Sequence, residues 1–329
     1  MTSLVKDLNS KWAPSTESST QRKRLVIVGD VHGRLPQLMK LLEKIGFDNK
    51  SGDHLVFTGD LINKGPDSPG VVQLAMDLGA SAVRETTKIA CWRRMHSLRA
   101  VVFPTTSGSD GRLVFEDSNV PLPEDIPYAV SSDYVTATQL SEEQVAWLSS
   151  LPLILRIGTL QGATTAPWNA GSIVVAHAGL VPSVPLEQQD PWAVMNMHGL
   201  VHPTEDTHHE TIQVALTKAA RDRFWRRASF EATADDAGLS QSPGSQDQEE
   251  TWRSPDGIAP IEASEGKLWR DAWNESQNLI EVPGQRTVVV YGHDARAGLQ
   301  VRREMDSSED LGEEGVNGVW SSVEQVKET

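Results

Sequence analysis

The chain has 329 residues, which is enough for one large domain or two ordinary ones. Its composition, with 38% hydrophobic and 23% charged residues, suits a folded globular protein and excludes one that is disordered throughout. The formal net charge of −15 argues against nucleic acid as a partner, and the single cysteine, Cys91, excludes an internal disulfide and favours a reducing compartment.

The amino-terminal segment, residues 1–22, is polar and rich in Ser and Thr, and we expect a flexible tail there. It lacks the apolar core of a secretory signal peptide. No apolar run in the sequence approaches the roughly 20 residues that a membrane-spanning helix needs. We therefore expect a cytoplasmic or nuclear protein without a membrane partner.

Two strand–helix units follow the tail. The run at 25–28 is short, apolar and β-branched, which predicts a strand, and apolar residues at helical spacing from Pro36 onward predict a helix. The unit recurs as a strand at 54–57 and a helix at about 69–78, and 82–83 begins a third strand. This alternation predicts an α/β layer structure with parallel strands.

The later elements are spaced less regularly. Ser141 with Gln144 forms a capping box, which predicts the start of a helix. Apolar runs predict strands at 153–157, 172–176 and 287–291. The order of elements continues the α/β pattern of the first third of the chain.

The remaining segments set the expected domain organisation. The stretch at 228–265 is rich in Ser, Gln, Asp, Glu and Gly, and we expect it to be a disordered insertion. The residues from 304 to 329 form an acidic tail without periodicity. One folded domain is therefore expected at 23–303, interrupted by that insertion.

Four of the predicted strands end in Asp or His. Asp30 and His32 follow the first strand, Asp60 the second, and His177 and His293 the strands at 172–176 and 287–291. Side chains at the carboxyl ends of strands in an α/β sheet converge on one point. Carboxylates and imidazoles together suit Mn, Fe or Zn, and a bridging carboxylate can hold two such ions.

Taken singly, each of these features has an ordinary structural explanation. A lone Gly-Asp is usually a turn, and a lone histidine at a strand end is usually not a ligand. The conjunction of Asp-x-His at one strand end, Asp at the next, and two further histidines that each follow a β-branched run indicates a metal site.

Four motifs surround these residues: GDVHG at 29–33, GDLINKGPDS at 59–68, AHAGLVP at 176–182 and GHDARAGLQ at 292–300. In this order they resemble the motifs of the phosphoprotein phosphatases, and in particular of the ApaH-like branch, which is similar to bacterial diadenosine tetraphosphatases. The stretches at 190–197 and 268–274 resemble fungal members of that branch. The resemblance implies a calcineurin-like α/β sandwich, with two mixed sheets face to face and helices outside.

The resemblance also implies a role for each residue. Asp30 and His32 would bind a first divalent ion, Asp60 would bridge to a second, and His177 with His293 would complete the second position. Asp30, His32 and Asp60 would then be the catalytic residues, and the ions would be Mn, Zn or Fe. Lys64 stands where the family places a basic residue against the substrate phosphate, and lysine is a sound point-charge phosphate binder.

One family motif is missing. The family has Gly-Asn-His-Glu after the third strand, whereas this chain runs directly from Arg84 to Glu85, without the Gly, Asn and His. The Asn binds the second metal in the family and the His is the general acid, whose contribution is typically about 10²–10⁴-fold. His96 lies downstream beside Arg93, and we interpret it as an ordinary histidine rather than a substitute. The strands that usually follow the last histidine are also absent.

The expected function is that of a metallophosphatase, with direct attack by metal-bound hydroxide on a phosphate ester or anhydride. Three substrates remain open: a phosphoprotein, a dinucleoside polyphosphate and inorganic polyphosphate. The alternatives are a catalytically impaired pseudophosphatase or scaffold, a chain altered by wrong exon joins, and an adaptor that uses the insertion at 228–265 to bind a partner.

Overall fold

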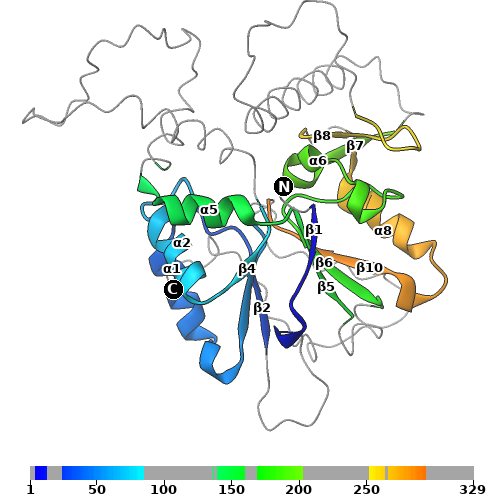
Figure 1. Ribbon diagram of the computed structural model, residues 1–329. Coiled ribbons are helices and arrows are strands. Elements are labelled where there is room, and N and C mark those ends of the chain that lie inside the picture. Colours follow the sequence, from blue (N-terminus) through cyan, green and yellow to red (C-terminus); the bar gives the residue numbers. More distant parts are fainter. Residues whose placement is uncertain are drawn as a thin grey trace, which may run out of the picture.

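The computed structural model describes residues 4–12, 24–84, 136, 139–159, 169–202, 252–263 and 266–293. Within these residues the strands form three sheets (Figure 1). None of the helices in this part of the chain is long and apolar enough to cross a membrane. The expected cytoplasmic or nuclear location stays a prediction.

The first sheet is parallel throughout. It has the order β2-β3-β4 and consists of β2 (Leu25–Val28), β3 (His54–Phe57) and β4 (Ser81–Ala82). Its outer face is covered by α1 (Leu35–Lys44), α2 (Ser68–Asp77) and α5 (Glu142–Ser150) (Figure 1). The strands run parallel because a helix connects β2 to β3 and another connects β3 to β4.

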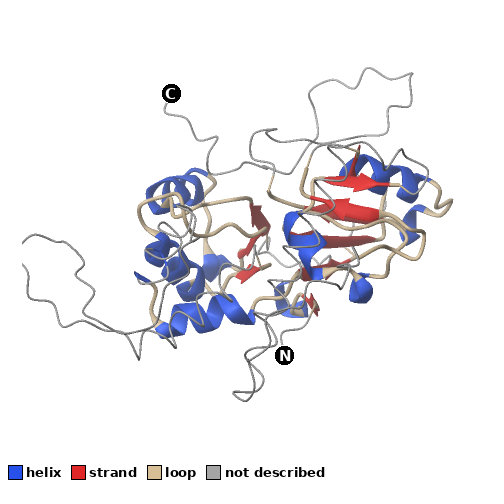
Figure 2. Ribbon diagram, turned by 90° about the horizontal axis from the view of Figure 1, so that it is seen from above, coloured by secondary structure: helices blue, strands red, loops and turns tan. Residues whose placement is uncertain are grey.

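The second sheet is mixed and has the order β1-β5-β6-β10. Its strands are β1 (Val5–Asp7), β5 (Ile154–Gly158), β6 (Ser172–Ala176) and β10 (Thr287–Val290). β5 and β6 are antiparallel, whereas β1 runs parallel to β5 and β10 runs parallel to β6. The helices α6 (Pro191–Asn196) and α8 (Trp269–Asn278) lie on its outer side (Figure 2).

A small antiparallel sheet adjoins the second one. Its strands are β7 (Gly199–Val201), β8 (Ala259–Ile261) and β9 (Lys267–Leu268), in the order β8-β7-β9. Four short 3₁₀ helices complete the described elements: η1 (Ser10–Trp12), η2 (Asn49–Ser51), η3 (Leu186–Gln188) and η4 (Pro283–Gln285).

The alternation of side chains along each strand builds the sandwich. In β3, Leu55 and Phe57 pack toward the helices, whereas Val56 packs toward the second sheet. In β6, Val174 packs toward α6 and α8, whereas Val175 faces the first sheet. One apolar layer therefore lies between the two sheets. A second layer lies between the first sheet and its helices, and a third lies between the second sheet and its helices.

The predicted α/β sandwich is confirmed, with two differences. The sheet β2-β3-β4 is parallel rather than mixed, and a third sheet is present. The strands at 25–28, 54–57 and 172–176 have the predicted bounds. The capping box before α5 is also formed, since the Ser141 hydroxyl accepts from the Gln144 amide at 3.2 Å and the Gln144 side chain accepts from the Ser141 amide at 3.1 Å.

The prediction of a flexible tail over 1–22 is wrong for residues 4–12. β1 pairs with β5 in register Val5 to Ile154, and Leu8 is buried between the sheets. A strand of three residues is too short to show a periodic pattern in the sequence. Its partner, β5, lies about 150 residues away along the chain, so no local signal marks the pairing. The rest of the predicted tail lies outside the described residues.

The predicted disordered insertion at 228–265 is wrong for residues 252–263. β8 pairs antiparallel with β7, and Ala259 and Ile261 are fully buried. The composition of the segment as a whole conceals a short apolar stretch that pairs only in the folded chain. Other predicted features lie outside the described residues, namely residues 228–251 of the insertion, the acidic tail, Glu85 and His96.

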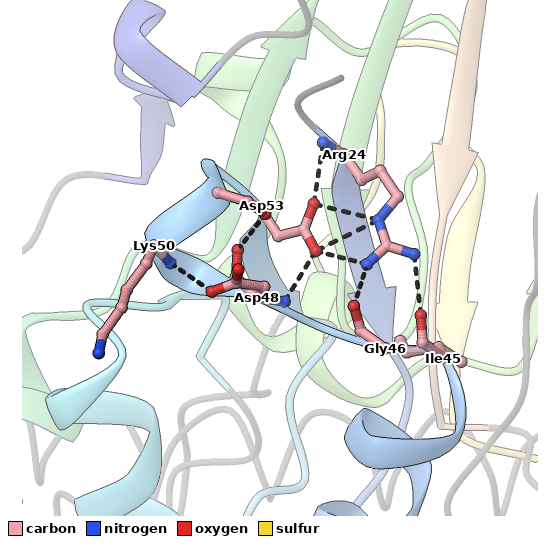
Figure 3. A network of polar contacts seen from close by, with 7 residues as sticks. Arg24, Ile45, Gly46, Asp48, Lys50 and Asp53 are labelled. Carbon is pink, nitrogen blue, oxygen red and sulfur yellow. Dashed lines mark hydrogen bonds and ion pairs between the residues drawn. The ribbon is translucent and has the colours of Figure 1, made fainter. Parts of the chain in front are cut away.

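An ion pair fixes the beginnings of β2 and β3 to the end of α1 (Figure 3). The buried carboxylate of Asp53 accepts from Arg24 Nε at 3.0 Å and from the Asp48 amide at 2.9 Å. The same guanidinium donates to the carbonyls of Ile45 at 2.9 Å and Gly46 at 2.7 Å. Burial by itself raises the pKa of Asp53, but the hydrogen bonds from Arg24 and the Asp48 amide lower it below its usual value.

The amino-terminal segment also contacts the first sheet. The indole of Trp12 stacks on the imidazole of His54, with the ring centroids 4.4 Å apart and the planes 10° from parallel. His54 Nε2 lies 2.9 Å from Ser81 Oγ. Burial, together with the nearby charge of Lys11, lowers the pKa of His54 to about 4.

We expect His54 to make the fold sensitive to acid. Its pKa falls from 6.5 in the unfolded chain to about 4 in the folded protein, so between these values the unfolded chain binds more protons. The free energy of unfolding therefore decreases as the pH falls from 6.5 toward 4. His54→Phe keeps the stack on Trp12 and should lose less thermal stability than the wild type between pH 7 and pH 4.5. An equal loss in both proteins would contradict this assignment.

Candidate metal centre

The ends of four strands bring the predicted ligands together between the two large sheets. Asp30 and His32 follow β2, and Asp60 follows β3, whereas His177 and His293 follow β6 and β10. One ligand atom from each of Asp30, His32 and Asp60 lies within 4.8 Å of the other two. His177 and His293 join this cluster from the second sheet, through the contacts described next.

The carboxylate of Asp60 faces both sheets. Its Oδ2 lies 3.1 Å from His32 Nε2, and its Oδ1 lies 3.5 Å from His177 Nε2. The two oxygens thus point to two different imidazoles, which come from β2 and β6. A carboxylate in this position is suited to bridge two cations, each of which is also held by one of the histidines.

Backbone carbonyls fix both imidazoles in one tautomer. His32 Nδ1 lies 3.3 Å from the Ile62 carbonyl, and His177 Nδ1 lies 2.9 Å from the Thr58 carbonyl. A carbonyl oxygen only accepts, so each Nδ1 carries a proton, and in the neutral ring the lone pair is on Nε2, on the side of Asp60 where a cation would bind. Histidines that bind metals in proteins are usually oriented in this way.

His293 closes the cluster through its backbone and its ring. Its amide donates to both oxygens of Asp30, at 3.2 and 3.1 Å, and its Nδ1 lies 3.2 Å from His177 Nε2. Burial, with the neighbouring rings of His177 and His198, lowers the pKa of His293 to about 3, so the ring is neutral at pH 7. Burial raises the pKa of Asp30.

The backbone is strained at this cluster. A positive φ is uncommon for residues other than glycine, and it gathers at functional sites, where the surrounding structure maintains it. The site residues in this conformation are His32 (49°), Asp60 (45°), Asn63 (69°), Lys64 (60°) and His293 (67°).

Two glycines allow the side chains to approach so closely. A Cβ at Gly59 would lie 2.5 Å from His177 Nδ1, and a Cβ at Gly292 would lie 2.3 Å from Asp30 Oδ1. Both distances are shorter than real contacts allow. Glycine therefore stands before Asp60 and His293 because a larger side chain would clash with the site, and not only because glycine allows a turn.

The donors fit divalent transition metals. Imidazoles whose Nε2 atoms face the cluster, together with carboxylates from two strands, form the mixed nitrogen and oxygen set that Mn, Fe and Zn accept. The residues that would hold the first ion are Asp30, His32 and Asp60, and those for the second are Asp60, His177 and His293.

Comparison with known proteins agrees with this geometry. Residues 23–91 match the calcineurin-like phosphoesterase family. A crystal structure of a protein provisionally assigned as a diadenosine tetraphosphatase has the same fold, with a TM-score of 0.51 and 23% identity over 92% of this chain and 85% of that one. Residues 23–91 thus carry the sequence pattern of that family, and the described part of the chain has the fold of that structure.

Curated relatives include phosphohydrolases of two kinds. The symmetrical bis(5'-nucleosyl)-tetraphosphatase of Aliivibrio fischeri is 26% identical over 212 residues, which are 60% of this chain and 63% of that protein. Serine/threonine-protein phosphatase 1 of Salmonella typhimurium is 47% identical over 58 residues, which are 18% of this chain and 26% of that protein. The matched part is thus less than two thirds of the length of either relative.

Lys64 lies in the same cluster as the predicted ligands. Its Nζ is 2.8 Å from His32 Nε2, where the ring presents a lone pair. A cation at this point is favoured by the nearby carboxylate of Asp60. An ion bound through His32 Nε2 would displace the ammonium, and the flexible side chain would carry its charge toward a phosphate.

The third strand of the first sheet ends without a ligand among the described residues. The amide of Arg84 donates to the Pro152 carbonyl at 2.7 Å, and its guanidinium donates to the Ser149 carbonyl. Arg84 therefore turns toward the end of α5. The place of the missing Gly-Asn-His, immediately before Glu85, lies where the described residues end.

His198 is a neighbour of the site that sequence reasoning missed. Its ring stacks on His293, with the centroids 4.4 Å apart and the planes at 21°. It follows α6 and precedes β7, so no strand end of the first two sheets marks it. The one available signal was that His198 directly follows the stretch at 190–197, which resembles fungal members of the ApaH-like branch.

Gly59→Ala should weaken metal binding while the domain stays folded. The new methyl group would meet His177 Nδ1 and break its hydrogen bond to the Thr58 carbonyl. Gly79→Ala is the control for backbone strain, because Gly79 also has a positive φ (59°) but has nothing within 4 Å of its Cβ position. Gly79→Ala should lose roughly 1–2 kcal/mol of stability from backbone strain, and Gly59→Ala should lose more because its methyl group also clashes with His177.

Calorimetric titration with Mn²⁺ and thermal unfolding separate the two effects. Only Gly59→Ala should bind Mn²⁺ at least about tenfold more weakly than the wild type. Equal metal affinity in both variants would mean that His177 does not bind the ion.

Proposed function

We propose that this chain is a metal-dependent phosphoesterase, which hydrolyses a phosphate ester or anhydride with two divalent cations at the Asp60 cluster. One observation carries the proposal: one carboxylate oxygen of Asp60 faces His32 and the other faces His177. Each imidazole has its Nδ1 on a backbone carbonyl, as in histidines that bind a metal through Nε2. Divalent ions in such a pair lower the pKa of bound water and neutralise the charge of a phosphate.

The residues of the chain have distinct tasks in this mechanism. Asp60 holds the two cation positions at a fixed spacing. The Ile62 and Thr58 carbonyls keep the imidazoles of His32 and His177 in the required orientation. Lys64 offers its ammonium to a non-bridging phosphate oxygen, on which negative charge is held during the reaction.

The relatives favour an anhydride substrate. The match that extends over 60% of this chain is a symmetrical bis(5'-nucleosyl)-tetraphosphatase, so we propose a dinucleoside polyphosphate as the substrate to test first. A phosphoprotein is the second candidate, because the relative from Salmonella typhimurium is a protein phosphatase. Inorganic polyphosphate has no such relative among these proteins.

A scaffold that has lost its activity is the less favoured alternative. Asp30, His32 and Asp60 lie close enough together to hold one ion, His177 lies 3.5 Å from Asp60, and the backbone around the cluster is strained. A non-catalytic domain has no need to maintain that strain. The missing general acid lowers the expected rate but leaves the cluster in place.

The reaction should depend on Asp60. Mn²⁺-dependent phosphate release is measured with diadenosine tetraphosphate, a phosphopeptide and an aryl phosphate. Asp60→Asn should lower the rate at least about 100-fold, because a neutral amide cannot bridge two cations. Asp77→Asn, an exposed position on α2, is the control and should be as active as the wild type. Wild-type rates in Asp60→Asn would contradict the proposed mechanism.

Restoring the missing motif should raise the rate. Insertion of Gly-Asn-His between Arg84 and Glu85 returns an amide ligand and a proton donor, and a general acid contributes about 10²–10⁴-fold. Insertion of Gly-Ala-Ala has the same length and should bring no gain. If neither insertion changes the rate of phosphate release, proton donation at this position is not what limits the reaction.

A further inference from the structure

A fourth histidine lies beside the cluster without belonging to the predicted ligand set. The imidazole of His198 covers one face of His293. The ring of His293 also contacts His177 edge-on, at a centroid distance of 4.9 Å, and has a hydrogen bond with the backbone of Asn196. The plane of His293 is thus bounded by one ring on its face and another at its edge. Two such contacts leave its side chain little freedom to rotate.

The main chain holds His198 rigidly. Its amide donates to the Ile261 carbonyl at 3.0 Å, and its carbonyl accepts from the Trp269 amide at 3.2 Å. These bonds connect it to the end of β8 and to the beginning of α8. Trp269 of α8 is buried against the second sheet, and Ile261 of β8 is buried in a separate apolar cluster with Val201 and Ala259. The position of the His198 ring is therefore set by the small third sheet.

We propose that His198 is a positioning residue, which fixes the imidazole plane of His293 so that the second cation is bound with the ring already oriented. The inference rests on the proposed function, because it concerns the second of the two cation positions. Holding a ligand in one orientation before binding removes the entropic cost of ordering it, and so raises the affinity for the metal.

Direct binding of the same ion by both rings does not fit the geometry. The lone pair of an imidazole nitrogen lies in the plane of the ring. His198 and His293 are stacked, with planes only 21° from parallel, so an ion in the plane of His293 lies well outside the plane of His198. The contribution of His198 is therefore made through its face rather than through its nitrogen atoms.

Substitution by Phe and by Ala separates the two contributions. His198→Phe keeps an aromatic face against His293 but has no nitrogen, whereas His198→Ala removes the face. His202→Ala is the matched control, since His202 stands at the other end of β7, away from the cluster. Each protein is titrated calorimetrically with Mn²⁺, and thermal unfolding without metal confirms that it is folded.

The wild type should bind two Mn²⁺ per chain. In His198→Ala the second binding step should weaken about tenfold or more, with the first step unchanged. His198→Phe and His202→Ala should stay within about threefold of the wild type, which lies below the effect expected for loss of a supporting residue.

Three results would overturn the inference, and they have different meanings. If His198→Phe is as weak as His198→Ala, a nitrogen of His198 is what matters. If His198→Ala binds both ions like the wild type, the stack does not orient His293, and the proposed function stands. If the wild type binds fewer than two ions, both the inference and the two-cation mechanism fail.

Discussion

The structure depends on one carboxylate that two sheets share. Asp60 leaves β3 of the first sheet, yet one of its oxygens faces His177, which leaves β6 of the second. This contact requires the sheets to pack at a fixed separation, and the apolar layer around Val56 and Val175 sets that separation. The interior of the protein is close-packed, so a change of volume in this layer is transmitted to the site. A change in the core between the sheets would thus affect the site as well as the stability of the fold.

Strain at the site is balanced by rigid structure away from it. Five residues around the cluster have a positive φ, and each costs on the order of 1 kcal/mol. Glycines at 59 and 292 remove the clashes that any side chain would add. At the opposite ends of the same strands, Arg24 and Asp53 join β2, β3 and the end of α1 (Figure 3). The strands are therefore anchored at one end and strained at the other, where the chemistry is proposed.

The third sheet contributes more than stability. β8 lies in a segment that the sequence composition assigns to disorder, yet its Ile261 carbonyl accepts from the amide of His198, whose ring stacks on His293. The end of β4, by contrast, contributes no ligand among the described residues, since Arg84 turns toward α5. The proposed support for the second cation position comes instead from His198, which lies between α6 and β7.

The sequence alone determined the strand–helix units, the ends of three strands and the residue types of the site. These features are local: β-branched runs form strands, and a Gly-Asp or an Ala-His after such a run places a ligand at its end. Only the tertiary structure decided which oxygen of Asp60 meets which ring, because that depends on how two sheets pack. It also decided the tautomers of His32 and His177, since the carbonyls that fix them carry no side-chain identity. β1, β8 and the stacking of His198 follow from pairing between distant segments, which no local pattern records.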